Sequence, residues 1–221
     1  MKRFLFFLTG AMLCSVSMLQ AQIAVPAGGV TLNFSSIPAD TEWNTYSVPG
    51  AGTTADTDAF MDTWMTTNAI PNITGGTNTL RTLAADATSS KAYWNSTSQR
   101  LVTQPTANAG TLLIAHLQNT SPGLVDSLSV SYTMFCGAAG TTTGDPIFGH
   151  RIFYSLTGNA GDWHPGLVPD QVLTAANTSA PKSFTLTSLG WAAGSLLYIV
   201  WADDNGGPNP DGDFGIDDIT F

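Results

Sequence analysis

The sequence is poor in charged side chains, above all in basic ones. Only 10% of its 221 residues are charged, with seven Lys and Arg against sixteen Asp and Glu, which gives a formal net charge of −9. A field of that sign repels nucleic acid, and no basic stripe offsets it, so we expect no nucleic-acid partner. Glutamate is almost missing, because Glu42 is the sole example. Jelly-roll glycosidases built on a Glu-x-Asp-x-x-Glu strand are therefore excluded.

Long apolar runs are also missing, apart from one at the start of the chain. Lys2 and Arg3 form a basic beginning, and a largely apolar stretch follows from Phe4 to Met18. This stretch is too short for a permanent membrane span, and no later segment is long enough for one. We expect a signal peptide at residues 1–21, a secreted, extracellular protein without a membrane span, and a single domain over residues 22–221.

Cysteine is scarce, with Cys14 and Cys136 as the two examples. Since Cys14 lies in the predicted signal peptide, an intramolecular disulfide is excluded after processing. Cys136 lies in an apolar segment, where we expect a small buried side chain. Stability must then come from packing and from any bound metal.

Hydroxyl, amide and glycine residues are abundant, and apolar residues alternate with them at a period of two. This alternation is typical of strands with one face in a core and the other in water. Two of the predicted strands, 111–117 and 196–202, are apolar on both faces, so we expect both of their faces to be covered. The other predicted strands are 30–34, 128–134, 152–156 and 183–187.

One short helix is predicted at 58–65, where Phe60 and Trp64 are four residues apart and Asp58 can cap the first turn. Many short strands and turn-rich loops with so little helix predict an all-β fold. We expect a single-domain antiparallel β-sandwich of the jelly-roll type.

The end of the chain concentrates its acidic residues. Ca²⁺ binds several oxygen ligands at once, and we predict a structural calcium site formed by Asp203, Asp204, Asn205, Asp211, Asp213, Asp217 and Asp218. The alternative is that these side chains accept hydrogen bonds from nearby backbone N–H groups, and the sequence leaves both open. The acidic segment is not an EF-hand loop, because Phe214 occupies the position where that loop needs glycine. Strict alternation places Asp217 and Asp218 on opposite faces of the last strand.

The same segment carries a family resemblance. Residues 197–205 and 213–219, with a Gly/Pro/Asn loop between them, resemble the closing hairpin of jelly-roll modules from secreted bacterial cell-surface proteins. The ending at 213–219 is also similar to that of MAM domains, which are adhesive jelly rolls that can hold a cation. The resemblance implies a MAM-like or concanavalin-like β-sandwich at a bacterial cell surface, with a role in cell adhesion.

Ligand-binding residues are sought among exposed rings, because aromatic faces stack on the C–H faces of sugars. The predicted set is Tyr93, Trp94, Arg151, Trp163 and His164. Each has a structural alternative: a loop tryptophan covers the edge of a core, and Arg151 pairs with an aspartate of the acidic end.

No residue is predicted to be catalytic. The three histidines show no zinc-ligand spacing, and no Gly-x-Ser-x-Gly motif occurs. We expect a non-catalytic module that binds an extracellular glycan or a cell-surface protein. The alternatives are a carbohydrate-active lyase or hydrolase using aspartates, and a purely structural surface protein.

Overall fold

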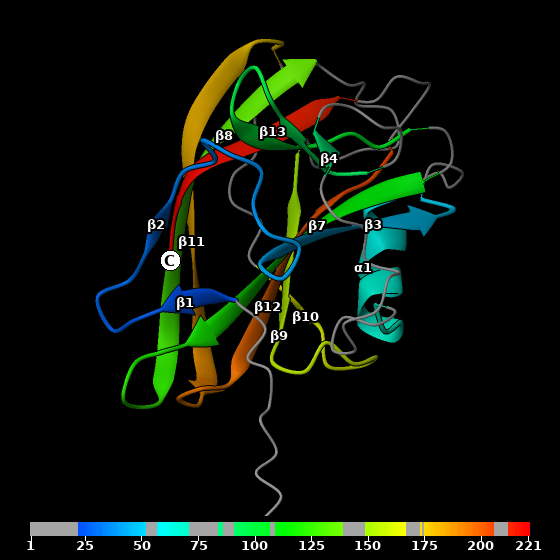
Figure 1. Cartoon of the computed structure of the whole chain (residues 1–221). Helices are drawn as coiled ribbons and strands as arrows, with labels where there is room; N and C mark the ends of the chain where they lie inside the picture. Colours follow the sequence, from blue (N-terminus) through cyan, green and yellow to red (C-terminus); the bar gives the residue numbers. More distant parts are fainter. Residues whose placement is uncertain are drawn as a thin grey trace, which may run out of the picture.

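Two β-sheets pack face to face in the computed structural model (Figure 1). It describes residues 22–51, 57–70, 84–85, 91–106, 109–138, 149–166, 173, 175–205 and 212–221. Sheet A contains β1 (Ile23–Val25), β3 (Trp43–Pro49), β7 (Ala109–Asn119), β9 (Arg151–Ser155), β10 (His164–Pro165) and β12 (Leu196–Asp203). Sheet B contains β2 (Thr31–Leu32), β4 (Ala84–Ala85), β5 (Tyr93–Asn95), β6 (Arg100–Thr103), β8 (Val125–Ala138), β11 (Thr178–Trp191) and β13 (Asp213–Thr220).

The predicted antiparallel β-sandwich is confirmed. Sheet A has the order β1-β7-β12-β9-β10, with β3 also on β7, and sheet B has the order β11-β8-β13-β6-β5-β4, with β2 also on β13. Of these pairings, β1–β7 and β4–β5 are parallel and the others are antiparallel. Within the described residues, no helix is long and apolar enough to cross a membrane. The predicted signal peptide lies outside the described residues.

The core lies between the sheets and is formed by alternate residues of their strands. Trp201 of β12 is fully buried, with ring centroids 5.7 Å from Trp43, 6.1 Å from Tyr132 and 6.5 Å from Phe184. Cys136 is buried in the same cluster, as expected of a small core residue. Large rings from both sheets therefore join the two layers without a disulfide.

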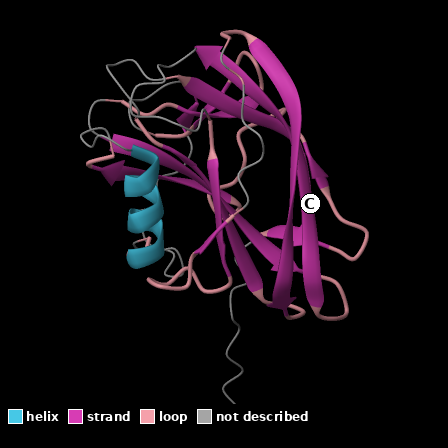
Figure 2. Cartoon of the chain, turned by 180° about the vertical axis from the view of Figure 1, so that it is seen from behind, coloured by secondary structure: helices cyan, strands magenta, loops and turns pink. Residues whose placement is uncertain are grey.

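The helix α1 (Thr57–Thr67) covers the outer face of sheet A (Figure 2). Met61 and Met65 of the helix lie in one buried cluster with Leu112 and Ile114 of β7 and Val200 of β12. This packing confirms the prediction that 111–117 and 196–202 are covered on both faces. Sheet A is consequently the middle layer of three.

An ion pair attaches the helix to sheet A. Arg151 at the start of β9 donates from Nε to Asp62 Oδ1 over 2.9 Å, and its Nη1 lies 3.4 Å from Asp58 Oδ1. The expectation that Arg151 pairs with an aspartate of the acidic end is therefore wrong. Asp58 is buried under the guanidinium, so the arginine offsets the cost of burying a carboxylate.

The predicted closing hairpin does not form. β12 pairs with β7 and β9 in sheet A, whereas β13 pairs with β8, β6 and β2 in sheet B. Both edges of β12 are already occupied, so the chain crosses to the other sheet before it continues. The acidic residues at the end of β12 and at the start of β13 therefore belong to different sheets.

Candidate functional site

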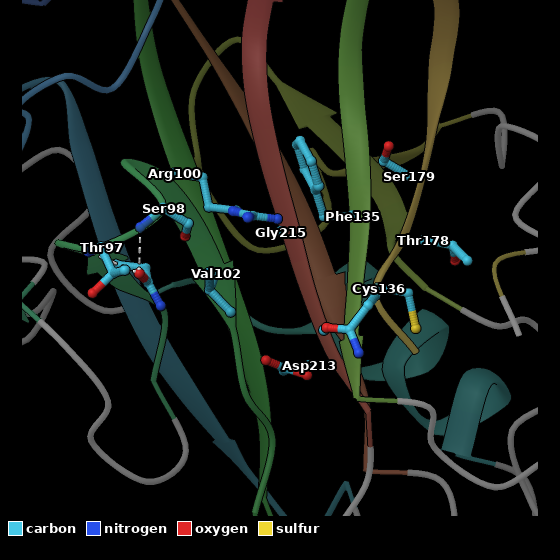
Figure 3. A pocket seen from close by; sticks show the side chains of 13 residues that line it. Thr97, Ser98, Arg100, Val102, Phe135, Cys136, Thr178, Ser179, Asp213 and Gly215 are labelled. Carbon is cyan, nitrogen blue, oxygen red and sulfur yellow. Dashed lines mark hydrogen bonds between the residues drawn. The ribbon is translucent and has the colours of Figure 1, made fainter. Parts of the chain in front are cut away.

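A groove of about 420 Å³ crosses the outer face of sheet B. We call it the sheet B groove. Strands β6, β13, β8 and β11 supply its floor, and the β5–β6 turn and the start of β11 supply its rim (Figure 3). The central residues of the floor are Arg100, Val102, Phe135, Asp213 and Gly215.

Arg100 and Phe135 form the centre of the groove. The Arg100 side chain extends from β6 across Gly215 of β13 toward Phe135 of β8 (Figure 3). Its guanidinium carbon lies 3.9 Å from the centroid of the Phe135 ring, which is a cation–π contact. Among the described residues, no carboxylate is within salt-bridge distance of Arg100. Within that part of the chain, no ion pair occupies its N–H donors.

Glycines make this arrangement sterically possible. A Cβ on Gly215 would lie 2.8 Å from Arg100 Cδ and 3.3 Å from the Leu101 carbonyl oxygen. A Cβ on Gly137 would lie 2.5 Å from Asp213 Oδ2. The arginine stem and the aspartate carboxylate thus lie directly on bare backbone, one on each side of the floor.

The rim is made of amide and hydroxyl side chains held by short local bonds. Asn95 Oδ1 accepts hydrogen bonds from the backbone N–H groups of Ser98, at 2.8 Å, and Thr97, at 3.1 Å, which fixes the β5–β6 turn. On the opposite rim, Asn177 has φ of 59° and precedes Thr178. Donors and acceptors on a fixed rim suit a hydroxyl-rich ligand, because their side chains lose little conformational freedom on binding.

A buried polar cluster lies on the core side of this floor. The Thr103 hydroxyl is 2.5 Å from Asp203 Oδ2 and 2.8 Å from His150 Nε2. If the hydroxyl donates its one hydrogen to the carboxylate, it accepts a hydrogen bond from the Nε2–H group of the imidazole. Burial lowers the pKa of His150 from 6.5 to about 3, so the ring is neutral. Because all three groups are buried, their role is to hold the end of β12 against β6.

The structure does not bring the five predicted ligand-binding residues together. Tyr93 and Trp163 are 5% and 3% exposed, so neither ring presents a face to solvent. Trp94 is half-buried and donates from Nε1 to the Phe34 carbonyl over 2.8 Å. Arg151 is paired with the helix. His164 alone is exposed, and it stacks on Tyr154 at a centroid distance of 5.1 Å.

Sequence reasoning missed Arg100 and Phe135, although the alternation of β8 contains a signal. The outward positions 127, 129, 131 and 133 carry Ser, Ser, Ser and Thr, and the next outward residue is Phe135. This ring interrupts the run of hydroxyl side chains on that face. The partner of that ring was hidden because Arg100 becomes its neighbour through the β6-β13-β8 order.

The predicted calcium ligands come from two strands of different sheets. Asp203 ends β12 in sheet A and Asp204 and Asn205 follow it, whereas Asp213 begins β13 opposite Ala138, and Asp211 lies outside the described residues. Among the residues that the structure describes, no three His, Cys, Asp or Glu side chains form a metal-binding group. Calcium binding at this end of the chain stays a prediction.

A bulge separates Asp217 and Asp218 from strict alternation. Asp218 has φ of 49°, and the register of β13 on β8 shifts between Asp217 and Thr220. Ile219 therefore joins Ile216 in the core, and Asp218 is exposed. The prediction of two opposite faces overlooked this shift, which keeps a carboxylate out of the core.

Asp217 is satisfied by backbone. Its Oδ1 accepts the Asp218 N–H over 2.8 Å, which is the alternative to metal ligation that the sequence left open. Partial burial raises its pKa, with a smaller increase from the Asp218 charge. The hydrogen bonds from Asp218 and Phe34 and the Arg100 charge oppose that increase.

Comparison with known proteins finds distant structural likeness and no match by sequence. No family model matches the chain, and no curated protein matches it. A solved structure of the N-terminal endo-1,4-beta-D-xylanase 10B from Clostridium thermocellum, with CBM22-1 and GH10 modules and bound xylohexaose, is similar at a TM-score of 0.36 and 12% sequence identity. The alignment covers 86% of this chain and 27% of that one.

Proposed function

We propose that the protein is a secreted, non-catalytic β-sandwich that binds a neutral extracellular glycan in the sheet B groove. The observation that carries this proposal is the Arg100 guanidinium on the Phe135 ring, with Asp213 in the same groove. A guanidinium donates several hydrogen bonds in a fixed plane, and a carboxylate accepts them. Together they suit the hydroxyl pairs of a sugar ring, and the half-buried Phe135 ring suits its C–H groups.

The charge of the chain favours a neutral ligand over an acidic one. The formal net charge is −9, and Asp213 adds a carboxylate to the groove itself. A uronate or sulfate polymer would meet repulsion from both, against one arginine. Neutral sugars gain hydrogen bonds without that electrostatic cost.

The groove favours binding over catalysis. Hydrolysis of a glycosidic bond commonly uses two carboxyl groups that flank the bond. Asp213 is the one acidic residue among the described residues that line the groove. The buried Asp203 and His150 lie on the core side of the floor, away from any ligand.

A glycan array tests this proposal, with and without EDTA. We expect binding to neutral glycans that EDTA leaves intact, because the groove contacts do not require a metal. Arg100→Gln should weaken binding at least ~10-fold, since hydrogen bonds to charged groups contribute about 1.5–3 kcal/mol. Lys182→Gln removes the same charge from the middle of β11 and should bind like the wild type. Binding to no glycan, or equal binding by Arg100→Gln, would contradict the proposal.

A further inference from the structure

A second cavity, of about 450 Å³, lies at the edge of the sandwich. We call it the edge pocket. Its walls come from β9, from the β9–β10 loop with β10, and from the end of β11. It therefore lies between the two sheets at an edge where the core reaches the surface. Its volume is in the ~300–1,000 Å³ range of small-molecule sites.

One wall of the edge pocket is a stacked pair of rings. Tyr154 and His164 are directly opposite each other on β9 and β10, and their rings stack at 5.1 Å with an angle of 28° between the planes. Tyr154 is half-buried against the core, and His164 is exposed. The neighbouring Trp163 is buried against the outer face of sheet A, and this packing anchors the loop that carries His164. The stack is thus a fixed surface on an anchored strand.

The other walls combine hydroxyl groups, one carboxylate and apolar carbon. Asp162 Oδ2 accepts a hydrogen bond from the Thr157 hydroxyl over 2.6 Å, so the β9–β10 loop is organised before any ligand arrives. Leu156 is 38% exposed and supplies the apolar carbon of the wall.

A distorted strand end completes the edge pocket. Ser188 has φ of 55°, a left-handed conformation that a non-glycine residue seldom adopts, and it lies in the bulge that shifts the β11 register after Thr187. Both residues line the edge pocket. Backbone strain of this kind persists where surrounding structure enforces it, often at binding sites.

We propose that the edge pocket is a second binding site for a neutral glycan, so that each molecule holds two sugar chains. The choice of ligand class rests on the proposed function of the groove. The stacked rings and Leu156 suit sugar C–H groups, and the hydroxyls and Asp162 suit sugar hydroxyls. An anionic ligand would be repelled by Asp162, which is the acidic residue among the described lining residues.

The two sites are too far apart to be one. Thr178 lines the groove and Thr187 lines the edge pocket, nine residues further along β11. A strand rises ~3.3 Å per residue, which separates the two by ~30 Å. The groove also faces outward from sheet B, whereas the edge pocket opens between the sheets. A trisaccharide cannot occupy both, and a polysaccharide suspension offers each site a different chain, which the protein then cross-links.

Calorimetric titration with cellotriose, xylotriose and mannotriose tests the inference. We expect two sites per molecule in the wild type for the trisaccharide that binds. His164→Ala removes one ring of the stack, and Thr187→Trp fills the cavity, so each should leave one site. Those two variants should keep the sheet B groove as their one site, whereas Arg100→Gln should keep the edge pocket. Thr185→Ala changes an exposed residue of β11 outside the edge pocket and should retain two.

The outcomes separate the two claims. One site in the wild type, lost in Arg100→Gln and unchanged in His164→Ala and Thr187→Trp, overturns the edge pocket and leaves the groove. One site lost in both edge-pocket variants and unchanged in Arg100→Gln overturns the groove and leaves the edge pocket. No binding of any trisaccharide contradicts both. Agglutination of insoluble cellulose, xylan or mannan particles by the wild type, with its loss in every single-site variant, supports cross-linking.

Discussion

The outer faces of the two sheets differ in what covers them. The outer face of sheet A lies under α1, and its residues Leu112, Ile114 and Val200 are fully buried. The outward residues of sheet B, such as Ser129 and Thr185, are exposed and bond to each other at 3.2 Å. Strand composition follows coverage, because a face against a helix must be apolar and a face against water need not be.

This difference shows where the molecule can accommodate a ligand. The central strands β7 and β12 of sheet A are covered on both faces, so substitutions there mainly change stability. Sheet B keeps an open face on which Arg100 and Phe135 can be placed without disturbing the core. The edge pocket arises where the covered interior of the sandwich meets solvent. The proposed binding sites thus lie on other surfaces than the buried packing that stabilises the fold.

The largest expected effect is a cavity under the helix. Leu112→Ala should lower the free energy of unfolding by about 2–5 kcal/mol, because Leu112 is fully buried between β7 and α1. Thr185→Ala, at an outward position of sheet B, should change it by less than ~0.5 kcal/mol. Urea unfolding of both proteins measures the contrast. Equal losses would show that the two outer faces are energetically equivalent and would remove the contrast between the sheets.

The ion pair on sheet A should matter next. Arg151→Gln deprives the buried Asp58 of its guanidinium, and we expect a loss of about 1–3 kcal/mol, the usual cost of an uncompensated buried polar group. Glycan binding should not change, because Arg151 lines neither site. Unfolding and array measurements on one preparation check both parts. If Arg151→Gln lost glycan binding and kept its free energy of unfolding, Arg151 would be a ligand-binding residue, as the sequence predicted.

Acid should destabilise sheet A through His116. Burial lowers its pKa from 6.5 to about 4, so between these values the unfolded chain binds a proton that the native protein does not. Stability therefore falls as the pH falls through this window, by up to ~1.4 kcal/mol per pH unit from this residue. His150 adds to the same trend. His116→Phe keeps a ring against Tyr198 and should make the slope shallower; an unchanged slope between pH 6.5 and 5 would contradict this assignment.

A single methyl group in the groove should separate binding from stability. Gly215→Ala places a Cβ 2.8 Å from Arg100 Cδ, so the side chain must leave the Phe135 ring. We expect the melting temperature to change little and glycan binding to weaken ~10-fold, because the hydrogen bonds of the guanidinium are misplaced. Gly123→Ala is the control that adds the same methyl group, because its Cβ would meet nothing within 4 Å and Gly123 does not line the groove. Full binding by Gly215→Ala would contradict the role proposed for Arg100.

Calcium is expected to have the smallest effect. If the acidic end binds Ca²⁺, adding it to EDTA-treated protein raises the melting temperature by mass action, and Asp218→Asn reduces the rise. Asp217 already accepts a backbone N–H, which leaves less of the segment for a metal. Calorimetric melts with and without Ca²⁺ decide between metal binding and hydrogen bonding to the backbone. An unchanged melting temperature would contradict calcium binding.

Much of the sandwich could be predicted, because alternation reports directly on burial. The long strands β8 and β11 and the doubly covered β7 and β12 follow from it, and four-residue spacing found α1. Strand β1 has three residues, too few for a period to show, and β3 begins with three buried residues in succession, so its burial does not alternate. The bulge at Asp218 depends on one left-handed residue, which no pattern marks. The groove was missed because strand order, which alternation does not contain, brings Arg100 to Phe135.

Glycan binding through Arg100 on the open face of sheet B, with stability supplied by the covered sheet A, can be examined in one comparison. A single neutral-glycan array is probed with wild-type, Arg100→Gln and Lys182→Gln proteins whose melting temperatures match. We expect equal signals for the wild type and Lys182→Gln and a signal at least ~10-fold weaker for Arg100→Gln. Equal binding by all three proteins would contradict the assignment of glycan binding to the sheet B groove.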